Sequence, residues 1–171
     1  MTNDTQNIIR HWREAVPNDR LAHLIRDASR AFQKALQIRL ASQGVPFGHW
    51  TFLRILWESD GLTQKELSER AGVMEPTTFT AMRAMEALGY IVRKQLPTNK
   101  KNVYVYLSEE GRALKKLLVP MAEDTNSVSI EGIAAGELKI TRKVLLTMIE
   151  NLGSDELQQT MPAKRKTAVA R

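Results

Sequence analysis

The stretch that decides the fold runs from residue 61 to residue 89 and reads GLTQKELSERAGVMEPTTFTAMRAMEALG. Thr63 and Glu66 have the spacing of a capping box, in which each side chain satisfies the backbone N–H of the other residue. Gly72 then interrupts the helical pattern, and a second helix is predicted over residues 76–88. Two short helices joined around a glycine turn form a helix-turn-helix unit.

Two β-branched and aromatic runs follow this unit, at residues 90–94 and 103–107. The polar and basic segment between them indicates a hairpin with a charged tip. Ser108 then has the character of a helix cap, and acidic residues occupy the first turn after it. The order along the chain is therefore helix, glycine turn, helix and basic hairpin.

Apolar residues recur at helical spacing through much of the remaining chain. This pattern predicts helices over residues 4–16, 21–40, 47–58, 108–130 and 137–152. Residues 154–171 lack a periodic apolar face and end in a basic cluster, so we predict a disordered tail. In the second helix of the helix-turn-helix, the residues expected in the core are Met82, Met85 and Leu88.

The composition excludes several classes of function. The chain has 171 residues, 25 Lys and Arg against 19 Asp and Glu, and no cysteine. It therefore has no disulfide, thiolate nucleophile, cysteine zinc site or thiol redox sensor. No apolar run reaches the ~18 residues that a membrane span needs, and we expect a cytoplasmic protein without a membrane partner. A net charge of +6 favours a polyanionic partner.

The positive charge is centred on the helix-turn-helix and the hairpin. Residues 61–107 hold seven Lys or Arg against four Asp or Glu, whereas residues 108–153 hold six against seven. From Arg93 to Val105 there are four basic residues and no acidic one. A hairpin whose charges are merely solvated would have the same composition, so this feature alone does not decide the function.

The second helix of a helix-turn-helix enters the DNA major groove by its N-terminal end. Here that end carries threonines, whose short hydroxyl side chains can approach phosphates and base edges. Threonines at a helix start are equally common as caps, and this alternative stays open. The hairpin lysines, Lys100 and Lys101, are expected near the DNA backbone or minor groove, where they add affinity more than sequence selection.

Taken in order, four stretches of the chain resemble the MarR family of winged helix-turn-helix transcriptional regulators: residues 61–72, 75–89, 91–94 and 106–112. The resemblance extends over roughly residues 20–152. It implies a mainly α fold with a small β-hairpin wing, a homodimer with intertwined terminal helices, and a pseudo-palindromic double-stranded DNA operator. We expect a protein that is not an enzyme and has no cofactor.

The resemblance divides the chain into parts with different roles. These parts are an N-terminal extension (1–18), a helical dimerisation region (19–45 and 108–153), a winged helix-turn-helix DNA-binding domain (46–107) and the basic tail (154–171).

The resemblance also places a set of residues at the DNA. They are Thr63, Gln64, Glu75, Pro76, Thr77, Thr78, Thr80, Arg83, Arg93, Lys94, Asn99, Lys100 and Lys101. Two positions depart from the family pattern. Asn99 and the two lysines stand where the family wing usually carries Asp followed by arginines, and lysine cannot make the planar forked contact of arginine. We therefore expect looser minor-groove readout with phosphate binding retained. Thr80 stands where many members have arginine.

Many members of the family are repressors that a small aromatic or phenolic anion, or its thioester, releases from DNA. The wall of such a pocket is predicted from Arg26, Ser29, Arg30, His49, Trp50, Phe52 and Trp57. An arginine among aromatic rings suits an aromatic anion. As the alternative, the two tryptophans belong to the core and the two arginines are solvated or ion-paired.

Two other classes of function compete with a DNA-binding regulator. A winged helix can serve only for protein association, as a module without specific DNA binding. An enzyme would need a phosphate-binding glycine loop, a nucleophile with its base or a pair of carboxylates in a recognisable pattern, and the sequence has none of these. The three histidines have no metal-ligand spacing, so no metal is predicted.

Overall fold

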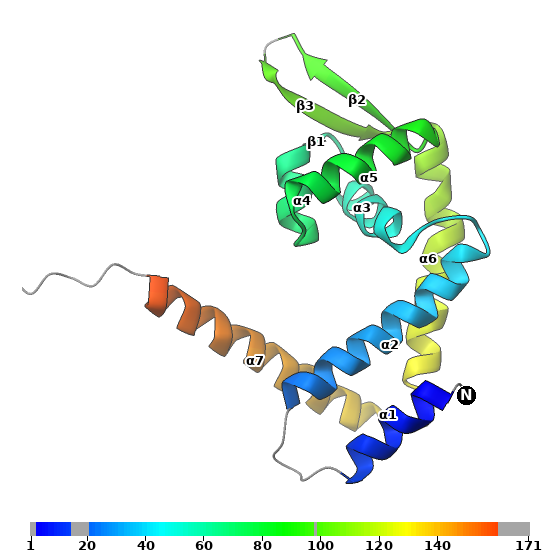
Figure 1. Cartoon of the computed structure of the whole chain (residues 1–171), viewed down its shortest axis with the longest axis vertical. Coiled ribbons are helices and arrows are strands. Elements are labelled where there is room, and N and C mark those ends of the chain that lie inside the picture. The colour runs from blue at the N-terminus through cyan, green and yellow to red at the C-terminus, as the bar shows by residue number, and fades with distance from the viewer. Residues whose placement is uncertain (1–2, 15–20, 98, 161–171) are drawn as a thin grey trace, which may run out of the picture. The chain divides into compact units, whose positions relative to one another are not determined.

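The computed structural model describes residues 3–14, 21–97 and 99–160, and the chain forms two compact units, residues 1–129 and 130–171. Figure 1 labels the helices and strands. The first unit contains α1 (Asn3–Glu14), α2 (Leu21–Ala41), α3 (Phe47–Glu58), β1 (Leu62–Thr63), α4 (Gln64–Ala71), α5 (Glu75–Ala87), β2 (Ile91–Leu96), β3 (Asn99–Leu107) and α6 (Glu109–Ser129). The second unit contains α7 (Ala135–Thr160).

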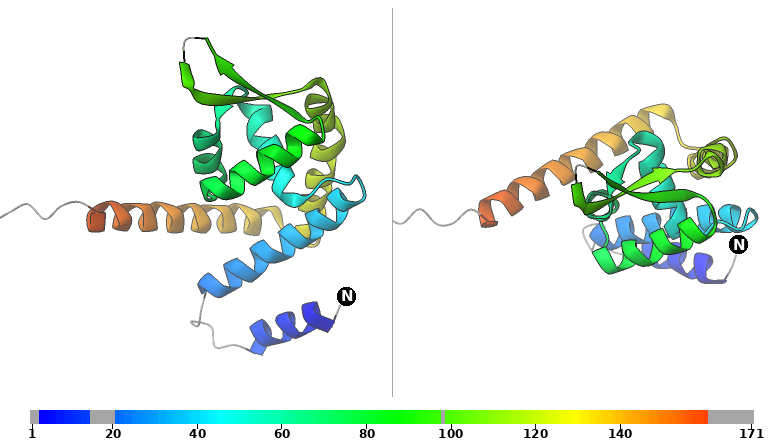
Figure 2. Two further views of the ribbon diagram at one scale, coloured as in Figure 1. Left: turned by 45° about the horizontal axis from the view of Figure 1, so that its top comes forward. Right: turned by 90° about the horizontal axis from the view of Figure 1, so that it is seen from above.

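The predicted fold class is confirmed, because the first unit combines helices with a small antiparallel sheet in the order β1-β3-β2. The β2–β3 hairpin extends beyond the helices of the helix-turn-helix, as a wing does (Figure 2). The short strand β1 was not predicted. It pairs Leu62 with Val105, so its existence depends on a partner more than forty residues away rather than on local sequence.

The capping box at the start of α4 is present as predicted. The Thr63 hydroxyl accepts a hydrogen bond from the Glu66 backbone N–H at 3.2 Å, and a Glu66 carboxylate oxygen accepts one from the Thr63 N–H at 2.7 Å. This hydrogen bond from the Thr63 backbone lowers the pKa of the Glu66 carboxyl. Gly72 ends the helix at φ +64°, a left-handed conformation that favours glycine.

The core of the first unit lies between α3, α4, α5 and the sheet. Met82 and Met85 are fully buried there, as predicted, together with Leu53 and Leu67. The prediction for Leu88 is wrong, because its side chain is 51% exposed. Leu88 follows the last residue of α5 and forms its C-cap, so it lies in the turn outside the packed face of the helix.

The first turn of α6 packs closely against the turn that follows α5. The Ser108 hydroxyl donates to the carbonyl of Gly89, and the Ser108 N–H donates to the carbonyl of Tyr90 at 3.1 Å. Trp57 of α3 donates its indole N–H to the Gly111 carbonyl at 2.8 Å. A Cβ atom at Gly111 would lie 2.0 Å from the Tyr90 carbonyl oxygen, so this contact requires glycine.

In the second unit, α7 extends to Thr160, so the prediction that this helix ends at Leu152 is wrong. Gly153 lies inside the helix, where a single glycine is tolerated, and the residues after it are mostly helix formers. The Ser154 hydroxyl donates back to the Glu150 carbonyl, which also fits continued helix. The rest of the predicted tail, 161–171, lies outside the described residues. Among the residues that are described, no helix has the length and apolar character that a bilayer crossing requires.

Gly111→Ala should lower the free energy of unfolding by about 3 kcal/mol, at the upper end of the cost of overpacking, because the obstructing atom belongs to the backbone. Gly48→Ala is the matched control: Gly48 lies in α3, and a Cβ there meets nothing within 4 Å. Urea unfolding followed by circular dichroism measures both variants. Equal stability of the two variants would contradict the packing argument.

Candidate nucleic-acid interface and effector cavity

The outward face of α5 presents side chains that are chemically suited to DNA. Thr77, Thr80 and Arg83 are exposed, and the opposite face carries the buried methionines. Glu75 and Pro76 are also exposed, in the first turn of the helix. No side chain caps the start of α5 at Met74. Pro76 has no backbone N–H, and the N–H groups of Thr77 and Thr78 donate to the Met74 carbonyl at 3.0 and 3.2 Å.

Thr78 does not belong to this outward face, and its predicted contact with DNA is wrong in this structure. Its side chain is fully buried, and its hydroxyl is hydrogen-bonded at 2.8 Å to that of Ser68 in α4. The pair joins the two helices of the helix-turn-helix. The burial of Thr78 could have been predicted, because helical spacing places it on the same face as the core residues Met82 and Met85.

Two further polar residues near the starts of α4 and α5 make hydrogen bonds within the protein, and a third has a buried amide nitrogen. The Thr80 hydroxyl donates to the Pro76 carbonyl at 3.0 Å. Its hydrogen is therefore used within the protein, and its methyl group is left for contact with a partner. The Thr63 side chain is used in the capping box. The Nε2 atom of Gln64 is buried and has no hydrogen-bond partner within the described chain.

The two basic residues of β2, Arg93 and Lys94, differ in their contacts. Arg93 of β2 donates through Nε to the Glu86 carboxylate of α5 at 2.8 Å, and its hydrogen bonds lower the pKa of Glu86. Arg93 thus holds the wing to α5. Lys94 is exposed and lies 5.8 Å from the centre of the Tyr106 ring. The backbone of Asn99, Lys100 and Lys101 belongs to β3, whereas their side chains lie outside the described part of the structure.

The structure does not bring the predicted pocket residues together in one wall. Arg26, Ser29 and Arg30 are exposed on α2, and Arg26 pairs with its neighbour Asp27 at 3.1 Å. On α3, the buried residues of the predicted set are His49, Trp50 and Phe52. Trp57 is half-buried and bonded to the Gly111 carbonyl. This arrangement is in line with the alternative, in which the two tryptophans belong to the core and the two arginines are solvated or ion-paired, although Trp50 also lines a cavity.

His49 combines burial with an unsatisfied ring nitrogen. It is 9% exposed, and its Nδ1 atom has no hydrogen-bond partner among the described residues. Burial lowers the pKa of the His49 imidazole, so the neutral form is favoured. The His49 and Tyr90 rings meet edge to face, with centroids 6.5 Å apart.

A cavity of about 280 Å³ lies between α2, α3 and α6. Its aromatic wall comes from Phe32, Phe47 and Trp50, and its cation is Arg54. Further lining residues are Gln33, Leu36, Thr51, Ala122, Thr125 and Asn126. The prediction therefore included Trp50 and missed Arg54. The signal was available in the sequence, because residues 47, 50, 51 and 54 have the i, i+3, i+4, i+7 spacing of one helix face.

These features define a winged helix-turn-helix protein in which α5, the second helix of the helix-turn-helix, has an exposed face, and a cavity lies between α2, α3 and α6. The model of the MarR family matches residues 48–103, which span α3 to the middle of β3. Over these residues the resemblance to the MarR family of transcriptional regulators that the sequence indicated is confirmed.

Three curated relatives are regulators as well. The organic hydroperoxide resistance transcriptional regulator of Bacillus subtilis (strain 168) is 26% identical over 78% of this chain and 90% of its own. The HTH-type transcriptional regulator TtmR of Methylorubrum extorquens (strain PA1) is 28% identical over 57% of this chain, and the match spans only half of its length. The homoprotocatechuate degradative operon repressor of Escherichia coli is 31% identical over 38% of this chain and 44% of its own.

Among solved structures, a MarR-family transcriptional regulator from Listeria monocytogenes in complex with 26mer DNA matches with a TM-score of 0.70. It is 26% identical to this chain, and the match covers 85% of this chain and 97% of the other. The relatives and this structure are all regulators, which agrees with the prediction that the chain is not an enzyme.

Thr78→Val should lower the free energy of unfolding by about 1 kcal/mol, because it removes one buried hydrogen bond at nearly constant volume. Thr77→Val is the matched control, since Thr77 is exposed and should leave stability unchanged. Thermal unfolding compares the two variants. If Thr78→Val were as stable as the wild type, the Ser68 bond would contribute nothing to the packing of α4 on α5.

Proposed function

We propose that this chain is a homodimeric repressor that binds a pseudo-palindromic DNA operator and is released from it by a small aromatic anion. The observation that carries the DNA part is the outward face of α5, which exposes Thr77, Thr80 and Arg83 while the opposite face buries Thr78, Met82 and Met85. Helices of this kind read base edges in the major groove. The similarity to a family member in complex with DNA supports the same role.

The homodimer is supported by the surface of α7. This helix has no buried residue within its unit, although it carries several large apolar side chains: Ile140, Val144, Leu145, Leu146, Ile149, Leu152 and Leu157. These residues lie on all sides of the helix. Large apolar side chains that are exposed on several faces of a helix favour a partner that covers them, and a second copy of the chain can supply it. We accordingly propose the predicted dimerisation region, 19–45 and 108–153, as the interface, extended along α7.

The wing lysines provide a test of DNA binding against the alternative of a protein-association module. Lys100→Ala with Lys101→Ala should weaken binding to all DNA sequences and lower the salt slope by about 0.9 for each phosphate that is no longer neutralised. Arg10→Ala with Arg13→Ala removes the same charge from exposed positions of α1, outside the wing and the proposed dimerisation region, and should leave the slope unchanged.

Fluorescence anisotropy measures these slopes between about 50 and 200 mM salt, a range over which the loss of phosphate contacts changes DNA affinity by orders of magnitude. The DNA is a fragment from upstream of the chain's own coding region. Absence of any salt-sensitive specific binding by the wild type would refute the proposed function and favour the protein-association module.

The effector is proposed to bind in the cavity between α2, α3 and α6. Aromatic side chains with one arginine suit a ring that carries a negative charge, since Arg54 can pair with a carboxylate or phenolate. The volume of about 280 Å³ is at the lower end of the range for small-molecule sites and favours a single-ring anion over its thioester. The name of the Escherichia coli relative, a repressor of a homoprotocatechuate operon, is compatible with an aromatic acid. With no cysteine in the chain, thiol oxidation cannot serve as the signal.

Arg54→Met should raise the salicylate concentration that releases DNA by at least about tenfold, because a hydrogen bond to a charged group contributes roughly 1.5–3 kcal/mol. Arg30→Met is the matched control, since Arg30 is an exposed arginine of α2 that does not line the cavity. DNA release is followed by anisotropy, and DNA affinity without salicylate should be equal in both variants. A loss of response in Arg30→Met alone would place the effector elsewhere.

A further inference from the structure

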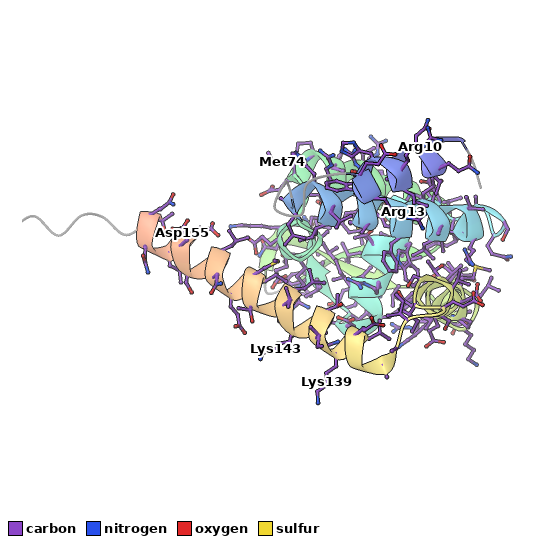
Figure 3. All side chains as sticks on the ribbon, turned by 90° about the horizontal axis from the view of Figure 1, so that it is seen from below. Arg10, Arg13, Met74, Lys139, Lys143 and Asp155 are labelled. Carbon is purple, nitrogen blue, oxygen red and sulfur yellow. The ribbon has the colours of Figure 1, made fainter. Side chains whose placement is uncertain are left out.

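The outward face of α5 carries one aromatic side chain that the proposed function has not used. Phe79 is 48% exposed, although the helix has a packed opposite face on which apolar residues are buried. Two apolar residues just before the helix are exposed as well, Val73 at 37% and Met74 at 76%, and Met74 is seen at the surface in Figure 3. Phe79 is therefore accessible to a partner that binds the outward face of α5.

Phe79 is also in contact with the guanidinium of Arg83. The Arg83 Cζ atom lies 5.9 Å from the centre of the Phe79 ring, one helical turn away. This distance is within the range of a cation–π contact, which restricts the arginine while leaving its N–H groups available. In the described part of the chain no carboxylate pairs with Arg83, whereas Arg93 is occupied by Glu86.

The two side chains match two different chemical groups of the major groove. The C5 methyl of thymine is an apolar contact for a phenyl ring, and the N7 and O6 atoms of guanine accept two hydrogen bonds from arginine. Base pairs are stacked about 3.4 Å apart, so a phenyl ring and a guanidinium about 6 Å apart reach the same or neighbouring base pairs.

We propose that Phe79 is a specificity-determining residue, which reads a thymine methyl group and holds Arg83 toward a guanine on a neighbouring base pair. The inference rests on the proposed function and deepens it, because it assigns the chemistry of part of each operator half-site. Neither Thr77 nor Thr80 supplies an apolar surface of comparable size on this face.

The test uses the full-length protein and a duplex that the wild type selects from a random-sequence pool. Each thymine is replaced in turn by deoxyuridine, which removes only the methyl group, and each guanine by 7-deazaguanine, which removes the N7 acceptor. Replacing one thymine per half-site should lower the affinity of the wild type about fourfold, the equivalent of roughly 0.8 kcal/mol for one buried methyl-sized group. Replacing a neighbouring guanine should also lower the affinity.

Three variants make the assignment specific. Phe79→Ala should be insensitive to deoxyuridine at that thymine. Arg83→Ala should be insensitive to 7-deazaguanine and should remain sensitive to deoxyuridine. Leu88→Ala removes an apolar side chain of similar exposure, 51% against 48%, at the C-cap of the helix and should keep both. Thermal unfolding of each variant checks that the fold is retained, as the exposure of all three side chains predicts.

Two results would overturn the inference and leave the proposed function intact. One is a selected duplex on which the wild type is insensitive to every deoxyuridine. The other is a Phe79→Ala profile identical to that of the wild type. If no duplex is preferred over random DNA, the proposed function and this inference are both refuted.

Discussion

The close approach between Gly111 and the carbonyl of Tyr90 is the constraint on which the arrangement of the first unit depends. At this point the first turn of α6 meets the end of α5, the start of β2 and the indole of α3. Asp60 reinforces the same junction, because one carboxylate oxygen accepts from the Leu107 N–H at 2.9 Å and the other from Arg112 of α6 at 2.6 Å. The recognition helix and the long helix α6 are thus joined by backbone contacts that leave no space for a side chain at Gly111.

This junction has a consequence for the proposed response to an effector. The cavity is lined by Thr125 and Asn126, which belong to the same helix as Gly111. A ligand that separates α2 from α6 would therefore act on a helix whose other end is bonded to the turn after α5. The ion pair between Arg39 of α2 and Asp124 of α6, at 2.8 Å, joins the same two helices next to the lining residue Thr125, so such a displacement would strain it.

The local sequence was sufficient to predict most of the fold. It was insufficient where an element depends on a contact with a residue far away in the sequence. The capping box, the glycine turn and the helical spacing over 47–58 depend on neighbouring residues, and those predictions are confirmed. The strand β1 depends on pairing with Val105, and the exposure of Leu88 depends on where α5 stops. At the candidate site the same division holds. Helix faces could have separated Thr78 from Thr77 and joined Arg54 to Trp50, whereas the pairing of Arg93 with Glu86 is a contact between a strand and a helix that spacing does not specify.

The distribution of charge connects these observations to DNA recognition. The helix-turn-helix and wing hold seven basic residues, but Arg93 is paired with Glu86 and Lys65 lies 3.9 Å from Glu69. On the outward face of α5, Arg83 is the one cation, so in the proposed complex the wing and its lysines contribute mainly phosphate contacts. Base selection must then come from few side chains. On a recognition helix that has threonines around a single arginine, the apolar contact of a ring such as Phe79 becomes more important for base selection. Such a surface can recognise mainly the thymine methyl groups and the shape of the groove.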